Sequence, residues 1–340
     1  MDRKKRLKAA GLLLAAAGII VLGTTWFLLF KHAPCMEGPE YVYIDTDDTT
    51  DSVCAKIRAV PHPGAIGGFR LLASLTTYNV KIGRYAILPG DNMLNVFRKL
   101  QRGHQEAVNL ALPSVRTMDR LAAVLGRKLM ADSATWAHAF ADTEFCRTYG
   151  YEPETLPCLF VPNTYQMYWD VNLPDFMKRM QKEHDSFWNE SRRQKAEAAG
   201  LTPNEVMTLA SIVDEETANN SEKPMVAGMY INRLRTDMPL QADPTVKFAL
   251  KDFSLRRIYH KHLLTPSPYN TYVQSGLPPG PIRIPSIAGI DAVLNHVKHD
   301  YIYMCAKEDF SGTHNFARTY AEHLANAARY SAALNRRGVK

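Results

Sequence analysis

The sequence predicts an α+β protein in which a transmembrane helix precedes a small α+β module and a larger mixed α+β domain. Three observations support this fold class: an uncharged apolar run near the N-terminus, strand-turn-helix patterns in residues 41–105, and well-capped helices in residues 200–325. With 340 residues, of which 46% are hydrophobic, the chain can bury more than one core.

The predicted transmembrane helix is the uncharged stretch of residues 11–30. About 20 apolar residues are needed to cross a hydrocarbon layer. Five basic residues precede the run and only Lys31 follows it directly, so the positive-inside rule predicts a cytoplasmic tail at 1–10 and export of everything after the helix. Residues 31–40 are then a linker. A cleaved signal peptide is the alternative, although 31–35 offer no small-x-small cleavage site.

Charge and cysteine usage argue against a nucleic-acid binder and against a zinc-binding protein. The tail carries +4 of the net charge of +7 and leaves only +3 for the body, which shows no basic stripe of the kind a nucleic-acid binder needs. The cysteines have no C-x-x-C spacing, so no zinc site is expected. A disulfide between Cys146 and Cys158 is one possibility, and free thiols throughout are the other. The cysteines are Cys35, Cys54, Cys146, Cys158 and Cys305.

The front module is predicted from two strand-turn-helix units. In the first, alternating residues 41–45 form a strand and a helix follows over 52–60. In the second, a strand over 80–87 leads through a Pro-Gly-Asp-Asn turn into a helix over 93–101 that Gly103 ends.

The middle of the chain is predicted from fewer signals. Residues 107–112 resemble a strand, helical segments rich in Arg, Lys and Ala follow, and residues 159–165 are expected to form a distinctive loop.

A strong helix start lies at Thr202. Thr202 is the expected N-cap, Pro203 suits the first helical position, and Glu205 can complete a capping box. The helix should run to about Thr217, and Pro224 then suits the first turn of a second helix.

Three adjacent acids end the first of these helices, and at 100° per residue they cannot share one face. Glu216 lies within roughly 60° of the apolar positions 209, 212 and 213, whereas Asp214 lies roughly 160° from Glu216. We therefore expect Glu216 alone to face the core. Burial, repulsion from Asp214 and Glu215, and the helix dipole should raise its pKa, as a general acid requires. The alternative is a solvated helix end whose acids pair with Lys or Arg.

Residues 210–217, Ala-Ser-Ile-Val-Asp-Glu-Glu-Thr, resemble the Ala-Ser-Ile-Val-Glu-Lys-Glu-Thr signature of the YceG-like (MltG) family of endolytic murein transglycosylases. The second Glu of that signature is the catalytic residue and aligns with Glu216. The chain departs from the signature at Asp214, where the family has Glu, and at Glu215, which replaces a basic residue and so removes a cation from near the acid.

Further blocks resemble the same family in the same order, from residue 40 to 325. The resemblance implies a LysM-like module at 41–105 and a YceG-like catalytic domain at 106–340 with its core at 200–325. Asn163 stands where the family has Asp, so a carboxylate role there is in doubt. The other matching blocks are 230–234, 240–246, 268–272, 276–282, 301–303, 312–316 and 319–323.

These blocks also supply the candidate substrate-binding residues. Amides, a carboxylate and a guanidinium can bind hydroxyl and N-acetyl groups, and tyrosines offer flat faces to sugar rings. For Arg233 and Asp243 the alternative to sugar binding is a structural ion pair. For Tyr269 and Tyr272 the alternative is a buried aromatic pair beside a stiff turn. The candidates are Asn232, Arg233, Gln241, Asp243, Thr245, Tyr269, Asn270, Tyr272, Pro278, Pro279 and His314.

The resemblance implies a lytic transglycosylase that needs neither metal nor other cofactor. Glu216 would cleave bonds between N-acetylmuramic acid and N-acetylglucosamine in nascent strands, form a 1,6-anhydro ring and limit strand length. Its partners would be peptidoglycan glycan strands, the bacterial cytoplasmic membrane that holds its anchor, and peptidoglycan synthases of elongation or division. The alternatives are a hydrolytic muramidase with Asp243 as second carboxylate, and a non-catalytic murein-binding scaffold.

Overall fold

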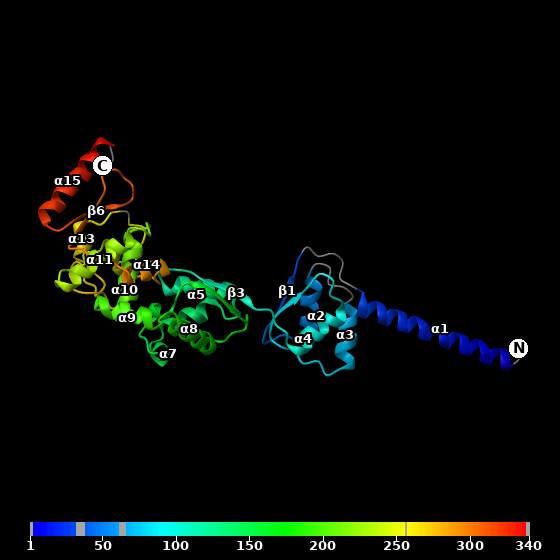
Figure 1. The fold of residues 1–340 in the computed structure, drawn as a ribbon. Helices are drawn as coiled ribbons and strands as arrows, with labels where there is room; N and C mark the ends of the chain where they lie inside the picture. Colours follow the sequence, from blue (N-terminus) through cyan, green and yellow to red (C-terminus); the bar gives the residue numbers. More distant parts are fainter. Residues whose placement is uncertain (1–2, 32–37, 61–65, 256, 338–340) are drawn as a thin grey trace. The chain divides into compact units, whose positions relative to one another are not determined.

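The computed structural model describes residues 3–31, 38–60, 66–255 and 257–337. The chain divides into two compact units (Figure 1). Met1–Asn109 belong to the first unit and most of the remaining chain to the second. Two short later segments, Lys128–Met130 and Gln166–Val171, also belong to the first unit, and no pattern in the sequence predicts this.

Helix α1 spans Arg3–Phe30 and includes the predicted membrane segment. Its stretch Lys5–Phe30 is long and apolar enough to cross a membrane, and none of its side chains is buried. The helix begins before residue 11 because the basic tail continues the same helical turns. Residues 32–37, which include most of the predicted linker and Cys35, lie outside the described residues.

The first unit is built on an antiparallel pair of strands, β1 (Glu40–Ile44) and β2 (Gly83–Ile87), with Val42 opposite Tyr85. Both strands were predicted, as were α2 (Thr50–Ala59) and α4 (Met93–Arg102). Gly103 ends α4 in the left-handed conformation, φ +72°, which glycine adopts without strain.

Helix α3 (Ile66–Leu75) completes the core of this unit and was not predicted. Phe69 is fully buried, with its ring 5.3 Å from those of Tyr78 and Phe97. These contacts with α4 and the chain before β2 show why α3 forms: its apolar face is covered by tertiary packing, which a weak local pattern does not reveal.

The middle of the chain differs from the prediction at one point. Strand β3 (Val108–Leu112) forms where expected, but its partner β4 (Asn163–Met167) begins inside the segment predicted as a loop. The 3₁₀ helix η1 (Leu156–Leu159) precedes it. Around these elements lie α5 (Met118–Lys128), α6 (Ser133–Ala141), α7 (Thr143–Thr148), α8 (Leu173–Phe187) and α9 (Glu190–Ala199).

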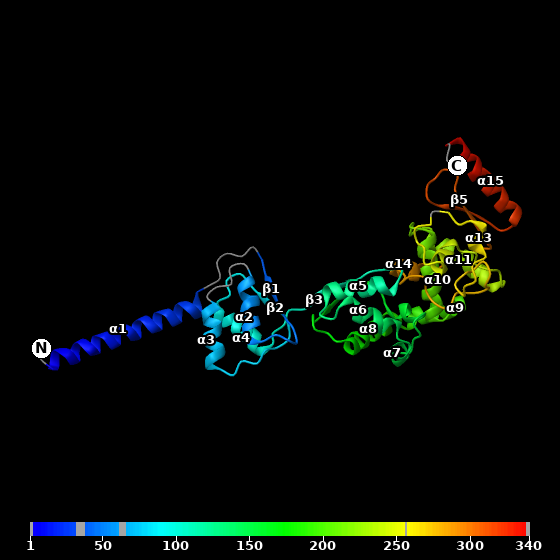
Figure 2. The ribbon, with the colours of Figure 1, turned by 180° about the vertical axis from the view of Figure 1, so that it is seen from behind.

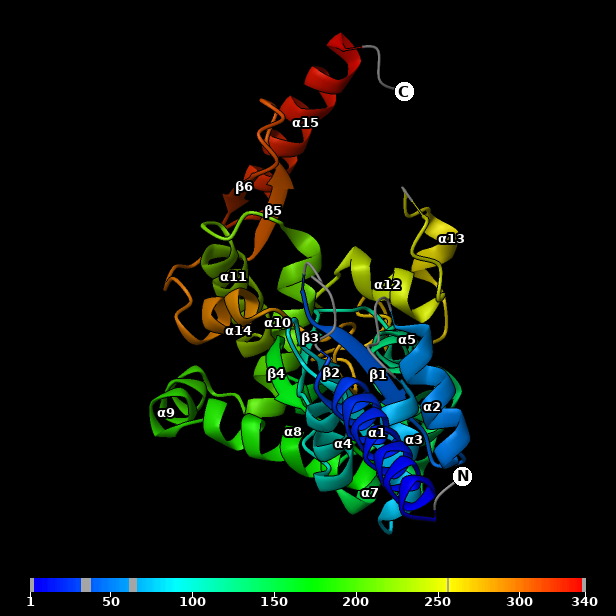
Figure 3. The ribbon, with the colours of Figure 1, turned by 90° about the vertical axis from the view of Figure 1, so that its right-hand side faces the viewer.

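Helix α10 (Pro203–Glu216) is the central helix of the second unit. The Thr202 N-cap, the capping box with Glu205 and the end near residue 217 are as predicted. Every residue from Val206 to Val213 is buried, because α9, α11 (Lys223–Arg235), α12 (Asp243–Ala249) and α14 (Ile287–Leu294) all pack on it. Figures 1 and 3 both show α10, α11 and α14 side by side. The short α13 (His260–Leu263) lies beyond α12 in the chain.

A C-terminal hairpin follows α14. Strands β5 (Tyr303–Ala306) and β6 (His314–Ala317) pair in antiparallel register, and both contact α15 (Tyr320–Arg336), as Figures 1 and 2 show. The strand predicted at 301–303 therefore begins two residues later. Thr319 caps α15 together with Glu322.

The described cysteines are thiols. Cys146 and Cys158 are both buried and unpaired, so the disulfide considered for them is not formed. Burial raises the pKa of Cys146 to about 11 and that of Cys158 to about 12, which keeps both groups protonated and unreactive at neutral pH.

Asp214 joins three helices at the end of α10. Its carboxylate accepts hydrogen bonds from the Lys223 ammonium at 2.6 Å and from the backbone N–H of Ser286 at 2.6 Å. Lys223 begins α11 and Ser286 caps α14. Only 3% of the Asp214 side chain and 7% of the Lys223 side chain are exposed. A Cβ added to Gly289 would meet an Asp214 oxygen at 2.6 Å, so the joint leaves no spare volume.

Replacing Asp214 by Asn should therefore destabilise the second unit. The Lys223 charge would remain buried without a counterion, and such a loss costs about 3 kcal/mol of unfolding free energy. Chemical denaturation of the full chain in detergent would measure it. Asp185→Asn, whose side chain is 74% exposed, is the matched control. Equal denaturation midpoints for the two variants would contradict the assignment, whereas Lys223→Met should restore part of the stability lost in Asp214→Asn.

Candidate active site around Glu216

Glu216 is the last residue of α10, and its side chain is partly buried against α11. The hydroxyl of Tyr230, a residue only 1% exposed, donates a hydrogen bond of 2.9 Å to Oε1 of Glu216. One carboxyl oxygen is thereby held in place by a rigid phenol, and Oε2 accepts no such hydrogen bond from the described residues.

The surroundings of Glu216 raise its pKa to about 7. The largest cause is burial, which disfavours the anion. Repulsion from Asp243 raises the pKa further, whereas the Tyr230 hydrogen bond and the charges of Arg233 and Lys247 lower it. A group with this pKa is partly protonated at neutral pH and can act first as an acid and then as a base.

The predicted direction of the shift is confirmed, but the predicted repulsion from Asp214 and Glu215 is wrong. Asp214 is held by Lys223 and Ser286. Glu215 accepts two hydrogen bonds of 2.8 Å from Arg116 and one of 2.9 Å from Arg283. The repelling carboxylate is that of Asp243, which lies 27 residues further along the chain.

The prediction that only Glu216 faces inward is also wrong. The side chains of Asp214 and Glu215 are 3% and 12% exposed. Helical periodicity separates faces only when one face meets solvent, and α10 is covered on all sides, so each acid meets a different neighbour. Arg116 and Arg283 also supply cations beside Glu215, where the resemblance suggested that a cation was missing.

A second pairing of a phenol with a carboxylate lies close to the first. Asp243 begins α12 and is exposed, and the Tyr272 hydroxyl donates a hydrogen bond of 2.7 Å to its Oδ1. Burial and this hydrogen bond raise the pKa of Tyr272 well above its usual value, so the phenol stays protonated. Glu216 and Arg233 both act electrostatically on Tyr272, which places the two pairings in one polar cluster.

Arg233 does not form the considered ion pair with Asp243 among the described contacts. Its guanidinium donates to the carbonyl oxygens of Ile302 at 2.7 Å and Leu240 at 2.6 Å, and burial lowers its pKa. It therefore holds the hairpin and the chain before α12 in position, and its charge lowers the pKa of Glu216.

Three other predicted binding residues are occupied by the protein itself. The Asn232 amide donates to the carbonyls of His299 and Tyr301, Thr245 is buried against Thr271, and Asn270 donates to the carbonyls of Leu263 and Thr265. Asn270 and Thr245 are fully buried, so they shape the loops around the cluster and offer no surface to a sugar.

The remaining predicted residues are spread over several positions. Gln241 is exposed in a left-handed conformation, φ +48°, next to Asp243. Pro278 is buried and Pro279 exposed. Tyr269 packs on Phe248, with ring centroids 4.7 Å apart, and no described ring contact joins it to Tyr272. His314 donates its backbone N–H to Glu222 at 2.6 Å, and its ring Nδ1 lies 3.1 Å from the other Glu222 oxygen.

Two residues of the cluster were missed as site residues. Tyr230 was noted only as part of a family block, because its bond to Glu216 depends on how α11 packs on α10. Lys247 follows Asp243 by four residues, so helical spacing could have placed the two on one face of α12.

Comparisons with known proteins identify the family of the chain. The family described as YceG-like matches residues 42–329. An endolytic murein transglycosylase of Bacillus subtilis is 34% identical over 166 residues, which are 49% of this chain and 45% of that protein. One from Streptococcus pneumoniae is 26% identical over 77% of this chain and 53% of its own length. The chain thus spans about half the length of the curated relatives it matches.

A crystal structure of a YceG-like protein from Listeria monocytogenes has the same fold, with a TM-score of 0.54 and 27% identity. The match covers 84% of this chain and 98% of that one. Since the family match covers most of the sequence, including α10, the polar cluster and the hairpin, the chain belongs to the YceG-like family.

Proposed function

We propose that this protein is an endolytic murein transglycosylase in which Glu216 breaks bonds between N-acetylmuramic acid and N-acetylglucosamine in nascent peptidoglycan strands. The observation that supports this most directly is the carboxyl group itself, with a pKa of about 7 and one oxygen fixed by Tyr230. The names of the relatives from Bacillus subtilis and Streptococcus pneumoniae support the same activity.

The proposed reaction needs one residue in two protonation states. Protonated Glu216 donates its proton to the glycosidic oxygen, and the bond from that oxygen to C1 of the muramic acid breaks. The C6 hydroxyl of the same sugar then attacks C1, and its proton passes to the Glu216 carboxylate. One C–O bond breaks, one forms as a 1,6-anhydro ring, no water is consumed, and Glu216 regains its proton for the next cycle.

Tyr230 and Asp243 would assist by different means. Tyr230 occupies Oε1, which leaves Oε2 to carry the transferred proton. Asp243 is an exposed anion oriented by Tyr272, and it would stabilise the positive charge that develops at C1. Among the predicted binding residues, Gln241, Asp243 and Pro279 are exposed and Tyr272 is half-buried, and we assign these four the sugar contacts.

The N-terminal helix would place this chemistry at a membrane. We propose that residues 1–10 stay in the cytoplasm, that α1 crosses the bacterial cytoplasmic membrane, and that both later units lie outside it, where new strands emerge from synthases. Cutting there would limit strand length. The first unit, as a LysM-like module over 41–105, would hold glycan by its strand-turn-helix surface.

A hydrolytic muramidase is the second candidate, because Asp243 is a second carboxylate in the same cluster and could activate water. Product analysis separates the two enzymes: anhydro-muramoyl ends indicate a transglycosylase, and reducing muramic acid indicates hydrolysis. A non-catalytic murein-binding scaffold predicts binding without either product.

Replacing Glu216 by Gln should abolish cleavage. The amide keeps the size of the side chain but cannot donate and recover the proton, so the rate of release of anhydro-muramoyl ends from purified peptidoglycan should fall at least ~100-fold. Glu197→Gln, an exposed acid on α9, is the matched control and should cleave as wild type does. If both variants release anhydro ends at the wild-type rate, Glu216 is not the catalytic acid.

The Tyr230→Phe variant tests the pKa assignment. Cleavage requires protonated Glu216, so activity should decline as pH rises through about 7 in the wild type. The Tyr230 hydrogen bond lowers the Glu216 pKa, so its removal should move this decline upward by about one pH unit. The measurement is the pH profile of the cleavage rate, with Tyr168→Phe, an exposed tyrosine, as control. If the cleavage rate of Tyr230→Phe declines at the wild-type pH or at a lower pH, the pKa assignment of Glu216 is contradicted.

A further inference from the structure

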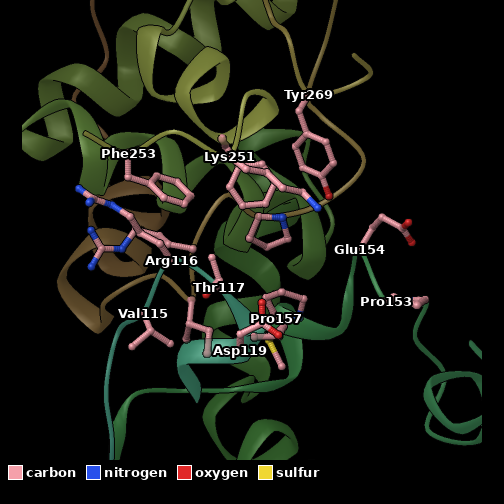
Figure 4. A pocket seen from close by; sticks show the side chains of 15 residues that line it. Val115, Arg116, Thr117, Asp119, Pro153, Glu154, Pro157, Lys251, Phe253 and Tyr269 are labelled. Carbon is pink, nitrogen blue, oxygen red and sulfur yellow. The ribbon is translucent and has the colours of Figure 1, made fainter. Parts of the chain in front are cut away.

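A pocket of about 350 Å³ lies in the second unit, next to the polar cluster (Figure 4). Residues 115–119, 153–157, 248–253 and 281–284 contribute to its walls. Phe248, Phe253, Tyr269 and Pro157 provide an apolar lining. Figure 4 shows Arg116 and Phe253 on one side of the pocket and Pro153 and Glu154 on the other.

The walls of the pocket are fixed in place. Ile284 donates its backbone N–H to the carbonyl of Val115 at 2.8 Å, and Ser114 donates its hydroxyl to the carbonyl of Ile284. At Gly280, an added Cβ would lie 2.0 Å from the carbonyl oxygen of Glu154, so the proline-rich loop sits directly on the opposite wall. A pocket held this way needs little ordering when a ligand binds.

The charges of the pocket are of both signs. Arg116 and Arg283 share Glu215, so this group of three carries one net positive charge. Lys251 is an exposed cation, and no described salt bridge includes it. Asp119 and Glu154 are exposed acids of the same lining. The pocket therefore offers cations and anions around an apolar centre.

A second, smaller pocket adjoins this one. Arg116 and Phe253 line both pockets. The smaller one is also lined by Lys247, whose charge acts on Glu216, and by Pro244, which follows Asp243. Because Lys247 lines the smaller pocket and its charge acts on Glu216, we expect a group attached to a sugar at Glu216 to pass Lys247 toward the larger pocket.

We propose that the larger pocket binds the peptide stem carried by the muramic acid whose bond Glu216 breaks. This inference rests on the proposed function. A stem is a short peptide with small apolar residues, free carboxylates and, in its diamino acid, an ammonium group. The apolar lining would take the methyl groups, Arg116 and Lys251 a carboxylate, and Asp119 or Glu154 the ammonium.

Two substrates test the proposal: glycan strands that carry their stems and strands stripped of them by an amidase. The full-length wild type should cleave intact strands faster than stripped ones. Lys251→Gln should lower the rate on intact strands roughly fivefold, the scale of a partly exposed ion pair, and leave stripped strands unaffected. Lys261→Gln, an exposed lysine on α13 outside the pocket, is the matched control and should change neither rate.

The outcomes separate this proposal from the one on which it rests. Cleavage of neither substrate by wild type would overturn the transglycosylase itself. Equal rates on both substrates, unchanged by Lys251→Gln, would overturn the stem site alone. An equal loss on both substrates would make the pocket a sugar site and overturn the stem assignment as well.

A binding measurement does not depend on catalysis. The Glu216→Gln variant should bind a soluble disaccharide-peptide more tightly than the same disaccharide without peptide, and adding Lys251→Gln should remove most of that difference. Equal affinities for the two ligands would contradict the stem site.

Discussion

The site depends on one constraint: α10 is buried on every side from Val206 to Val213 and yet ends in three consecutive acids. Each acid leaves the helix in a different direction, and each meets a different neighbour. Asp214 is neutralised by Lys223, and Glu215 by Arg116 and Arg283. Only Glu216 lacks a salt bridge among the described contacts, and its environment favours the protonated form. The cations at the end of α10 thus neutralise Asp214 and Glu215, and Glu216 remains able to exchange a proton.

The same constraint explains why Asp214 stabilises the fold while Glu216 at the end of the same helix can react. The nearly unexposed Asp214–Lys223 ion pair and the Asp214–Ser286 hydrogen bond hold α10, α11 and α14 together, whereas the cluster around Glu216 uses phenols in place of cations as close partners. A phenol donates a hydrogen bond without adding a full positive charge, so it orients a carboxylate with a smaller effect on its pKa than a contacting lysine would have.

Much of the fold could be predicted because its signals are local. The apolar run of α1, the caps of α10 and α15, and the strand-turn-helix unit ending at Gly103 each depend on neighbouring residues. Helix α3 and strand β4 were missed because distant segments stabilise them.

The site could be predicted only in part, for a similar reason. Glu216 was identified from its helix and its resemblance to a known signature, and the direction of its pKa shift followed from burial. The residue that repels it, Asp243, and the one that holds it, Tyr230, come from other helices. Several polar residues assigned to sugar binding instead hydrogen-bond the protein, because a polar side chain in a matching block can serve the substrate or the fold, and sequence alone does not distinguish them.

The hairpin after α14 is held in place mainly through its backbone. Asn232 and Arg233 bond carbonyl oxygens of residues 299–302, and Glu222 accepts the N–H of His314. Carbonyl and N–H groups are present whatever the side chain, so these contacts survive substitution of the residues that offer them. His299 is different, because its ring also bonds the carbonyl of Met225 at 3.0 Å. Related proteins could therefore diversify Asp300 and Ile302 while the three anchoring side chains remain fixed.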